Sequence, residues 1–318
     1  MDEGVRMKKS IYTAVSVVIS ISLLALLLHT REDRALAAAP RTVPEWKKIF
    51  VRHIDQPLTY AGFISRDRGI TVGVHGLVYY TENAGRSWKE SLNQSACRHG
   101  LDIIDDTHAW HCGNRSVRRS VDSGKTWTEA SDFGEAEPLH ARFISFADEK
   151  EGIIATDVKA AVTDDGGLSW KIIQLPQYVI EIAALSASYE GNDRSGSERT
   201  PIFRIMDQKG NIRISRDGCA TWTEVTSPAT GMNPVIMADA PTSAMRFNAD
   251  GNGLISFFST SGGTIRPYVF RTTDGGKTWT GEHFPQCNTG TLFISPDLTL
   301  ITYIPGMKRS LSVFTITH

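Results

Sequence analysis

Carboxylate side chains recur at one fixed place in this sequence, each inside a short segment that ends in tryptophan. The segment reads Ser or Thr, any residue, Asp or Asn, two turn residues, any residue, Ser or Thr, and Trp. It occurs five times, at 81–88, 120–127, 163–170, 215–222 and 272–279. Carboxylates at such positions could act as acids or bases, or could accept hydrogen bonds from the backbone of a turn.

The surrounding residue types favour the structural role. An Asp or Asn side chain can accept N–H groups of its own turn, glycine supplies a positive φ, and a tryptophan that opens the next strand can pack beneath the turn. Cys219 occupies a position at which the other four segments have glycine, so a strained or rearranged turn is expected there. We therefore predict structural roles for Asn83, Asp122, Asp165, Asp217 and Asp274, and for Trp88, Trp127, Trp170, Trp222 and Trp279.

These segments resemble the bacterial-neuraminidase (BNR) or Asp-box repeat. The fuller unit, from Gly69–Gly73 through Gly76–Tyr79 to Trp88, resembles the photosystem II stability and assembly factor family. The resemblance covers residues 45–318 and implies a β-propeller, with seven blades in the assembly-factor family and six in sialidases. It leaves function open, because the same repeat occurs in sialidases, sorting receptors and non-enzymatic assembly factors.

Strand patterns allow the blades to be counted. Successive repeat tryptophans are 39, 43, 52 and 57 residues apart. The expected strands of the third blade before its turn are 141–147, 152–156 and 160–163, and those after the fifth turn are 291–295, 299–304 and 311–317. The last blade then lacks one strand, which 45–51 supplies, with Trp46 in the place of a repeat tryptophan. The sequence thus predicts an all-β, six-bladed propeller; seven blades are the alternative.

One face of this predicted propeller is basic. The links into each innermost strand and the loops between second and third strands share a face, on which propellers usually bind ligands. The candidates for binding on this face are His75, Arg98, His99, Arg115, His140, Arg142, Lys159 and Arg266. Further basic residues there are Lys209, Lys308 and Arg309, against the acids Asp157, Glu181 and Asp207. Such a face could attract an acidic protein, an anionic glycan or lipid headgroups, although lysine and arginine also commonly cap exposed loops.

The repeat also suggests a glycosidase function. A sialidase-like site requires three arginines that clamp a carboxylate, a Tyr–Glu nucleophile pair and an acid/base Asp. It also requires an Arg-Ile-Pro motif early in the first blade. The nearest match, Phe203–Met206, lies in the fourth blade and lacks the proline. No catalytic residue is assigned, and the protein is expected to be a non-enzyme.

The predicted propeller also contains four cysteines and one polar segment. Cys97 and Cys112 fall at the same end of two neighbouring strands, so a disulfide between them is plausible, whereas Cys219 and Cys287 are expected not to pair. No metal or cofactor site is expected. The segment 186–200 is rich in Gly, Ser and charged residues and is expected to be a surface loop, with a binding flap as the alternative.

The first forty-four residues have a different character. Residues 1–10 form a basic segment, 11–29 a hydrophobic segment whose residues 11–28 carry no charge, and 30–44 a linker to the propeller at 45–318. The hydrophobic segment is long enough to form a transmembrane helix, and Ala35–Ala37 offers a signal-peptidase site. An uncleaved anchor and a cleaved signal both remain open. Either one keeps the basic residues in the cytoplasm and exports the propeller.

Composition narrows the function further. The net charge of -1 gives no global basic field, which argues against nucleic-acid binding. We therefore expect an exported propeller in the periplasm or another extracytoplasmic space, anchored in the inner membrane or released by cleavage, that binds a protein of the cell envelope. Assembly or stabilisation of that partner and its inhibition, as by an immunity protein, are both compatible with this reading. The alternative is a glycan-binding propeller or a sialidase-like glycoside hydrolase.

Overall fold

The computed structural model divides the chain into two compact units, Met1–Thr42 and Val43–His318. The structure describes residues 45–93, 99–113, 116–132, 141–156, 158–176, 179, 181–189, 200–235, 242–261, 263–306 and 308–317. The predicted basic segment, hydrophobic helix and linker lie outside the described residues, so the fold below concerns the second unit alone.

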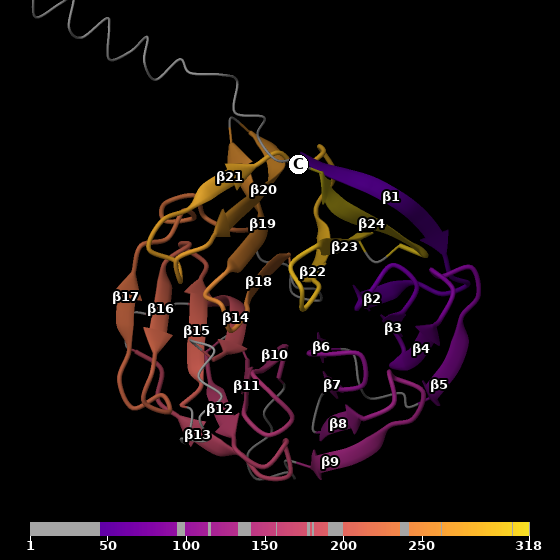
Figure 1. Cartoon of the computed structure of the whole chain (residues 1–318), viewed down its shortest axis with the longest axis horizontal. Coiled ribbons are helices and arrows are strands. Elements are labelled where there is room, and N and C mark those ends of the chain that lie inside the picture. Colours follow the sequence, from indigo (N-terminus) through magenta and orange to yellow (C-terminus); the bar gives the residue numbers. More distant parts are fainter. Residues whose placement is uncertain are drawn as a thin grey trace, which may run out of the picture. The chain divides into compact units, whose positions relative to one another are not determined.

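The described residues form 24 strands in six four-stranded antiparallel sheets, which are the blades of a propeller (Figure 1). The innermost strands are β2 (Leu58–Phe63), β6 (His99–Ile103), β10 (Phe143–Phe146), β14 (Ile182–Ser188), β18 (Ser243–Phe247) and β22 (Gly290–Ile294). The second strands are β3 (Gly69–Gly73), β7 (Ala109–Cys112), β11 (Gly152–Ala155), β15 (Ile202–Asp207), β19 (Gly253–Ser261) and β23 (Leu300–Pro305).

Each blade continues outward through two more strands. The third strands are β4 (Leu77–Thr81), β8 (Ser116–Ser120), β12 (Ala160–Thr163), β16 (Ile212–Ser215), β20 (Thr264–Thr272) and β24 (Ser310–Thr317). The outer strands are β5 (Lys89–Asn93), β9 (Thr128–Asp132), β13 (Lys171–Ile173), β17 (Thr223–Val225), β21 (Thr280–Glu282) and β1 (Glu45–His53). The prediction of six blades is therefore confirmed, and the seven-bladed alternative is wrong for this chain.

The burial of the strands explains why this sequence forms stacked blades. Every residue of β2, β10 and β14 is buried, whereas β13 and β17 on the periphery are mostly exposed. A strand with both faces covered reads as a continuous apolar run rather than as an alternating one. Among the described residues, the buried apolar side chains form six clusters, each made mainly by two adjacent blades. The core is therefore a ring of interfaces between blades.

The two ends of the propeller meet in one sheet. β1 pairs antiparallel with β24 from Glu45↔Thr317 to His53↔Ser310, so the N-terminal strand completes the blade made by the C-terminal strands (Figure 1). Trp46, at the start of β1, is fully buried, and its Nε1 donates to Oε2 of Glu282 in β21 at 2.6 Å. The backbone N–H of Trp46 also donates to the His283 carbonyl at 2.9 Å. The predicted closing strand is confirmed, and it also fastens its own blade to the preceding one.

Predicted and observed elements differ in small ways. Ser186–Ser188 were expected in a loop but belong to β14, because all three side chains are buried within the blade. Most of the remaining expected loop, 190–199, lies outside the described residues. The other predicted strands of the third and sixth blades agree with the structure to within about two residues at either end. Such shifts are ordinary for strand boundaries.

The closing strand gives a first testable prediction. Replacing Trp46 by Ala removes a fully buried indole and leaves the Glu282 carboxylate, which is also buried, without that donor. We expect Trp46→Ala to lower the free energy of unfolding by about 3–5 kcal/mol, measured by urea denaturation. Lys47→Ala, on the exposed side of the same strand, is the control. Equal stability of the two variants would show that the ring does not depend on this tryptophan.

Candidate functional site

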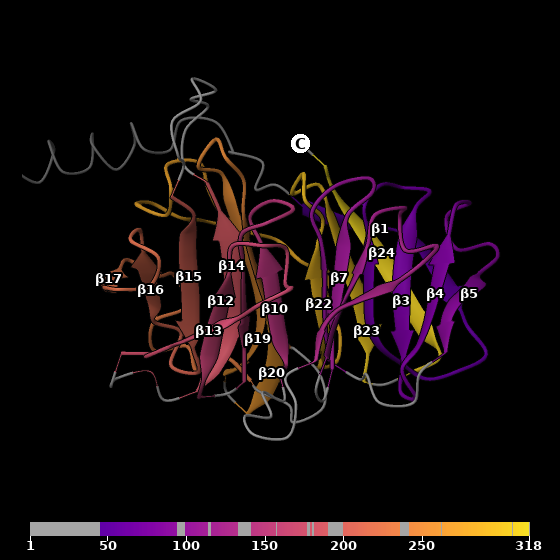
Figure 2. The same cartoon turned by 90° about the horizontal axis from the view of Figure 1, so that it is seen from below.

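The turns of the propeller lie on two opposite faces (Figure 2). The turns between second and third strands, together with the links between blades, form one face, which we call the linker face. The turns between first and second strands share the other face with the five repeated turns, and we call it the repeat-turn face; the end of β24 marks it in Figure 2.

The repeated turns use their acidic side chains as internal acceptors. In the turn before β21, the N–H of Thr278 donates to Asp274 Oδ1 at 2.9 Å, and the Thr278 hydroxyl donates to Oδ2 at 2.6 Å. The Thr272 hydroxyl donates to Oδ1 at 2.8 Å and accepts the Gly276 N–H at 2.9 Å. Equivalent bonds surround Asp122, Asp165 and Asp217. Asn83 replaces one carboxylate and accepts the Ser87 N–H at 3.0 Å.

These bonds favour the charged form of the carboxylates. Hydrogen bonds from the Thr221 side chain and backbone lower the pKa of Asp217 to about 2. At Asp122 burial alone would raise the pKa, but bonds from Thr126 and Ser120 outweigh it and lower the pKa below its usual value. Because both oxygens of each carboxylate already accept turn hydrogen bonds, the repeated aspartates serve the turns and are poorly placed to transfer protons.

Two successive residues in each repeated turn have positive φ. The glycine pairs take this conformation without strain, as at Gly275 (75°) and Gly276 (93°). In the other three turns one of the two residues is Ala84 (61°), Ser123 (67°) or Cys219 (71°), and the φ of Cys219 is in line with the strain expected at that position. The Cys219 side chain is buried among apolar residues of the third and fourth blades, including Phe203. The packing of this side chain offsets part of the cost of a left-handed conformation in a residue other than glycine.

Three of the five tryptophans that follow the turns form a hydrogen bond to the preceding blade. Trp127 Nε1 donates to Ser91 Oγ at 3.2 Å, and Trp170 Nε1 donates to Ser131 Oγ at 3.0 Å. Trp279 Nε1 contacts the Thr226 carbonyl at 3.3 Å in the same way. Each acceptor lies in or beside the outer strand of the preceding blade. The bond from Trp46 to Glu282 follows this pattern.

The structure places the predicted basic residues on the linker face where it describes them. His75 and Lys159 are exposed in the β3–β4 and β11–β12 turns, and Arg266 is exposed on β20. Arg142 is half-buried directly before β10, with its guanidinium 5.5 Å from the Phe143 ring centroid. The predicted residues that lie outside the described part are Arg98, Arg115, His140 and the side chain of His99.

The acidic side of this prediction needs a correction. Asp207 was expected to be a surface acid of the linker face, but it is fully buried. Its Oδ2 accepts from Arg213 Nη1 at 2.9 Å, and its Oδ1 accepts the backbone N–H groups of Lys209 and Asn211. The side chain therefore organises the β15–β16 turn from below. Lys209 and Lys308 lie in turns on this face as expected, and its described acids are Glu181 before β14 and Asp55 in the β1–β2 link, which the sequence analysis did not include.

The centre of the propeller holds a small cavity that the sequence analysis missed. It has a volume of about 70 Å³ and is lined by residues of all six innermost strands. Tyr60, Arg142 and Ser243 contribute polar groups to the lining, and the Tyr60 hydroxyl donates to the Arg142 carbonyl at 3.0 Å. Burial raises the pKa of Tyr60 well above its usual value, so this hydroxyl stays protonated. A predicted basic residue and the central cavity are therefore parts of one site.

An ion pair crosses the channel beside this cavity. Arg246 of β18 reaches the opposite blade, where its Nη1 lies 2.5 Å from Asp102 Oδ1 and its Nη2 donates to the Ile103 carbonyl at 2.8 Å. The other carboxylate oxygen, Asp102 Oδ2, accepts the Phe146 N–H at 2.7 Å. Arg246 thus joins three innermost strands. The two partners are 144 residues apart, and no motif or spacing connects them in the sequence.

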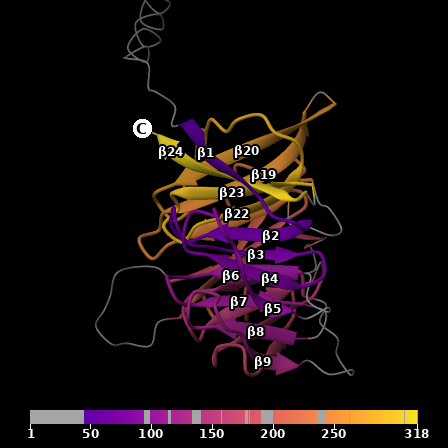
Figure 3. The same cartoon turned by 90° about the vertical axis from the view of Figure 1, so that its right-hand side faces the viewer.

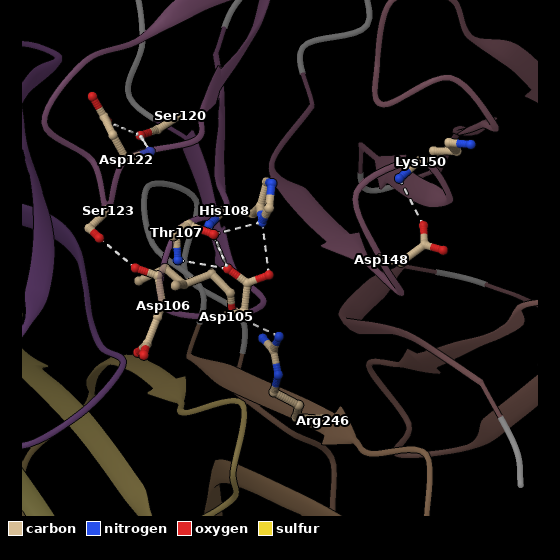
Figure 4. Close-up of polar contacts among 11 residues, drawn as sticks. Asp105, Asp106, Thr107, His108, Ser120, Asp122, Ser123, Asp148, Lys150 and Arg246 are labelled. Atoms are coloured by element: carbon tan, nitrogen blue, oxygen red, sulfur yellow. Dashed lines mark hydrogen bonds and ion pairs between the residues drawn. The ribbon is translucent and has the colours of Figure 1, made fainter. Parts of the chain in front are cut away.

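Figure 4 shows Arg246 close to the β6–β7 turn, on the repeat-turn side of the channel. In that turn Asp105 accepts the N–H groups of Thr107 and His108, each at 2.7 Å, and contacts His108 Nδ1 at 2.8 Å. Burial alone would raise the pKa of Asp105, but these bonds lower it to about 2. The polar groups described at this end of the channel therefore already have partners, either within the β6–β7 turn or in the ion pair.

One hairpin of the propeller is longer than the others. β19 and β20 have nine residues each, whereas most second and third strands have four to six. Only Val269–Arg271 of β20 pair with the outer strand β21, so the rest of β20 extends past the blade toward the side opposite the C-terminus (Figure 3). Ile265 and Arg266 are exposed on this extension. The hairpin therefore adds an apolar and a basic side chain to the linker face.

Three further features concern metal sites, membrane spans and cysteines. Among the described residues, no group of three or more His, Cys, Asp or Glu side chains could hold a metal ion. No helix in the described part of the chain is long and apolar enough to cross a membrane. Cys219 and Cys287 are free thiols. Cys97 lies outside the described residues, and the predicted disulfide with Cys112 therefore stays a prediction.

The described part of the chain is thus an all-β, six-bladed propeller with a narrow central cavity and several exposed basic side chains on its linker face. Its structure resembles that of YCF48 bound to D1 peptide, with a TM-score of 0.50 and 15% identity over 88% of this chain and 100% of that one. YCF48 from Cyanidioschyzon merolae gives 0.49 and 15%, covering 85% and 98%. The WD40 propeller domain of Doa1 gives 0.50 and 10%, covering 86% and 97%. No protein-family model and no curated protein sequence matches this chain. At these identities the likeness is one of fold.

The thiols of Cys219 and Cys287 give a second testable prediction. Burial raises the pKa of Cys219 to about 12 and that of Cys287 to about 11, so little thiolate forms near neutral pH. Because the thiolate is the reactive form, we expect iodoacetamide at pH 8 to alkylate both at least about a hundredfold more slowly in the folded protein than in urea. Peptide mass mapping over time measures each rate. Rapid labelling of Cys219 in the folded chain would contradict its burial.

The ion pair across the channel gives a third prediction. Asp102→Asn and Arg246→Met each leave the other group without its charged partner in a buried site, so each should lower the free energy of unfolding by about 3–5 kcal/mol. The double variant should lose less than the sum of the two, because no unpaired charge remains. The control, Asp106→Asn, breaks the exposed pair with Arg68 and should cost less than about 1 kcal/mol. Additive losses at Asp102 and Arg246 would show that the pair is not coupled.

Proposed function

We propose that this protein is a non-catalytic propeller whose linker face binds an acidic segment of a protein partner. The observation that carries the proposal is the convergence on one face of basic side chains from separate blades, around a cavity that one of them lines. His75, Arg142, Lys159 and Arg266 come from blades one, three and five, and Arg142 lines the cavity. Basic groups on rigid turns attract and orient an acidic partner.

The other face offers less for binding or catalysis. The repeated aspartates there accept hydrogen bonds within their own turns, and their pKa values are lowered rather than raised. A general acid or base works best with a pKa close to the working pH. The five turns also support assigning the repeats to the BNR or Asp-box class. In this chain that repeat builds the scaffold, and the ligand site lies on the opposite face.

The likeness to YCF48 bound to D1 peptide supports a protein partner, since a propeller of similar fold holds a peptide. We further propose that residues 1–29 direct the propeller out of the cytoplasm, by a retained anchor or a cleaved signal, so that its partner is a protein of the cell envelope. The apolar, uncharged run at 11–28 and the basic residues before it support this assignment. Assembly, stabilisation or inhibition of the partner would all use the same surface.

Charge reversal on the linker face tests the proposal. The variant Arg142→Glu/Lys159→Glu/Arg266→Glu replaces three basic side chains on the linker face. With the full-length tagged chain isolated from membranes, we expect the protein that copurifies with the wild type to be lost. With that protein purified, we expect the variant to bind about thirtyfold to a hundredfold more weakly at low salt, with a reduced salt dependence.

A matched control separates position from net charge. Arg86, Lys150 and Lys277 are exposed in turns of the repeat-turn face, and replacing all three by Glu changes the net charge by the same amount. This control should retain the partner and its affinity. Equal loss of binding in both variants would indicate a general charge effect, and retention of the partner by the linker-face variant would overturn the proposal.

A further inference from the structure

The central cavity has the properties of an anchor pocket. It is enclosed by all six innermost strands, and apolar side chains dominate its lining, among them Leu101, Ile144, Leu185 and Leu292. Ser243, which also lines it, is only 3% exposed, and its hydroxyl has no hydrogen-bond partner among the described residues. A buried hydroxyl without a partner is costly, so a ligand group or a water molecule should complete it.

We infer that this cavity receives one small side chain of the partner segment, of the size of valine or threonine, while acidic residues on either side of it contact the basic linker face. The inference rests on the proposed function and adds the identity of the residue that anchors the segment. The basic turns alone do not explain the buried Ser243 hydroxyl or the central channel, and a bound side chain gives both a role.

The size of the cavity limits its occupant. Its volume of about 70 Å³ is less than half that of an apolar cavity of about 150 Å³ that binds benzene. A branched side chain with three heavy atoms therefore fits the space, whereas an aromatic side chain does not.

The floor of the cavity argues against a charged occupant. Both terminal nitrogens of Arg246 are engaged, by Asp102 Oδ1 and by the Ile103 carbonyl, and Asp102 Oδ2 accepts the Phe146 N–H. The pair is balanced in charge and presents no uncompensated ion to a ligand. A buried charge without a partner is strongly unfavourable, so the occupant should be neutral.

The ends of the cavity indicate the direction of entry. Ser243 begins β18 and Arg142 directly precedes β10, and both positions are at the linker face. Asp102 and Arg246 each lie one residue from the other end of their strands. A side chain therefore enters from the linker face and stops at the ion pair. The half-buried guanidinium of Arg142 at the entrance is placed to meet an acidic residue next to the anchor.

A series of peptides tests this inference directly. Fluorescein-labelled peptides Glu-Asp-X-Asp-Glu, with X as Gly, Ala, Val, Thr, Leu or Phe, are titrated with the full-length protein, and binding is followed by fluorescence anisotropy. Valine and threonine should bind about tenfold more tightly than glycine, because each buries three additional heavy atoms. Phenylalanine should bind no better than glycine.

Substitutions at Ser243 then separate volume from hydrogen bonding. Ser243→Met fills the cavity and should reduce the affinities for valine and threonine peptides to that of glycine. Ser243→Ala should weaken only threonine, by about threefold to tenfold, because valine does not use the hydroxyl. Ser256→Ala is the matched control, since Ser256 is also buried with an unpartnered hydroxyl but does not line the cavity. It should leave all affinities unchanged.

The outcomes distinguish this inference from the proposed function. Equal affinities for all six peptides in the wild type, together with loss of binding in the linker-face variant, would overturn the anchor pocket and leave the proposed function intact. If the wild type binds none of the acidic peptides, both are overturned. The wild-type series decides the matter by itself, so a failure of Ser243→Met to fold, seen as loss of its thermal transition, does not affect the result.

Discussion

The pairing of β1 with β24 is the constraint on which the rest of the structure depends. Each blade buries its apolar surface only against two neighbours, so an open ring would expose one complete interface between blades. The contact of Trp46 with Glu282 extends the closure from one blade to the next, and Arg271 holds the same carboxylate at 2.5 Å. The closing residues therefore stabilise the whole ring, although they lie at only one place in it.

The antiparallel order of the four strands in each blade separates the turns into two faces of different character. On the repeat-turn face, hydroxyls and backbone N–H groups donate to the aspartates, and the tryptophans of three turns form hydrogen bonds to the preceding blade. On the linker face, the described turns carry exposed basic side chains. A rigid ring keeps these charges at fixed separations, which reduces the entropy lost when a partner binds. The acidic repeats thus stabilise the scaffold that carries the opposite face.

Structural features that are encoded locally and repeated could be predicted from the sequence. The spacing of Asp, Gly and Trp in the five turns predicted the blades, and the leftover strand at 45–51 predicted the closure. The sequence did not reveal Asp102 and Arg246, because two single residues in opposite blades leave no periodic signal and become neighbours only when the ring closes. The exposure of Asp207 was predicted wrongly for a similar reason. Its position beside a turn suggested an exposed side chain, but the side chain is buried and pairs with Arg213.

The number of blades finally connects the fold to the candidate site. An arginine on β18 can reach an aspartate on β6 only if the innermost strands of opposite blades lie close together, as they do in a six-bladed ring. A seventh blade would widen the channel, just as the diameter of a β-barrel increases with the number of its strands. The ion pair and the small cavity beside it are therefore consequences of six blades. A partner that inserts a side chain between these strands would recognise the blade number as much as the residues that line the channel.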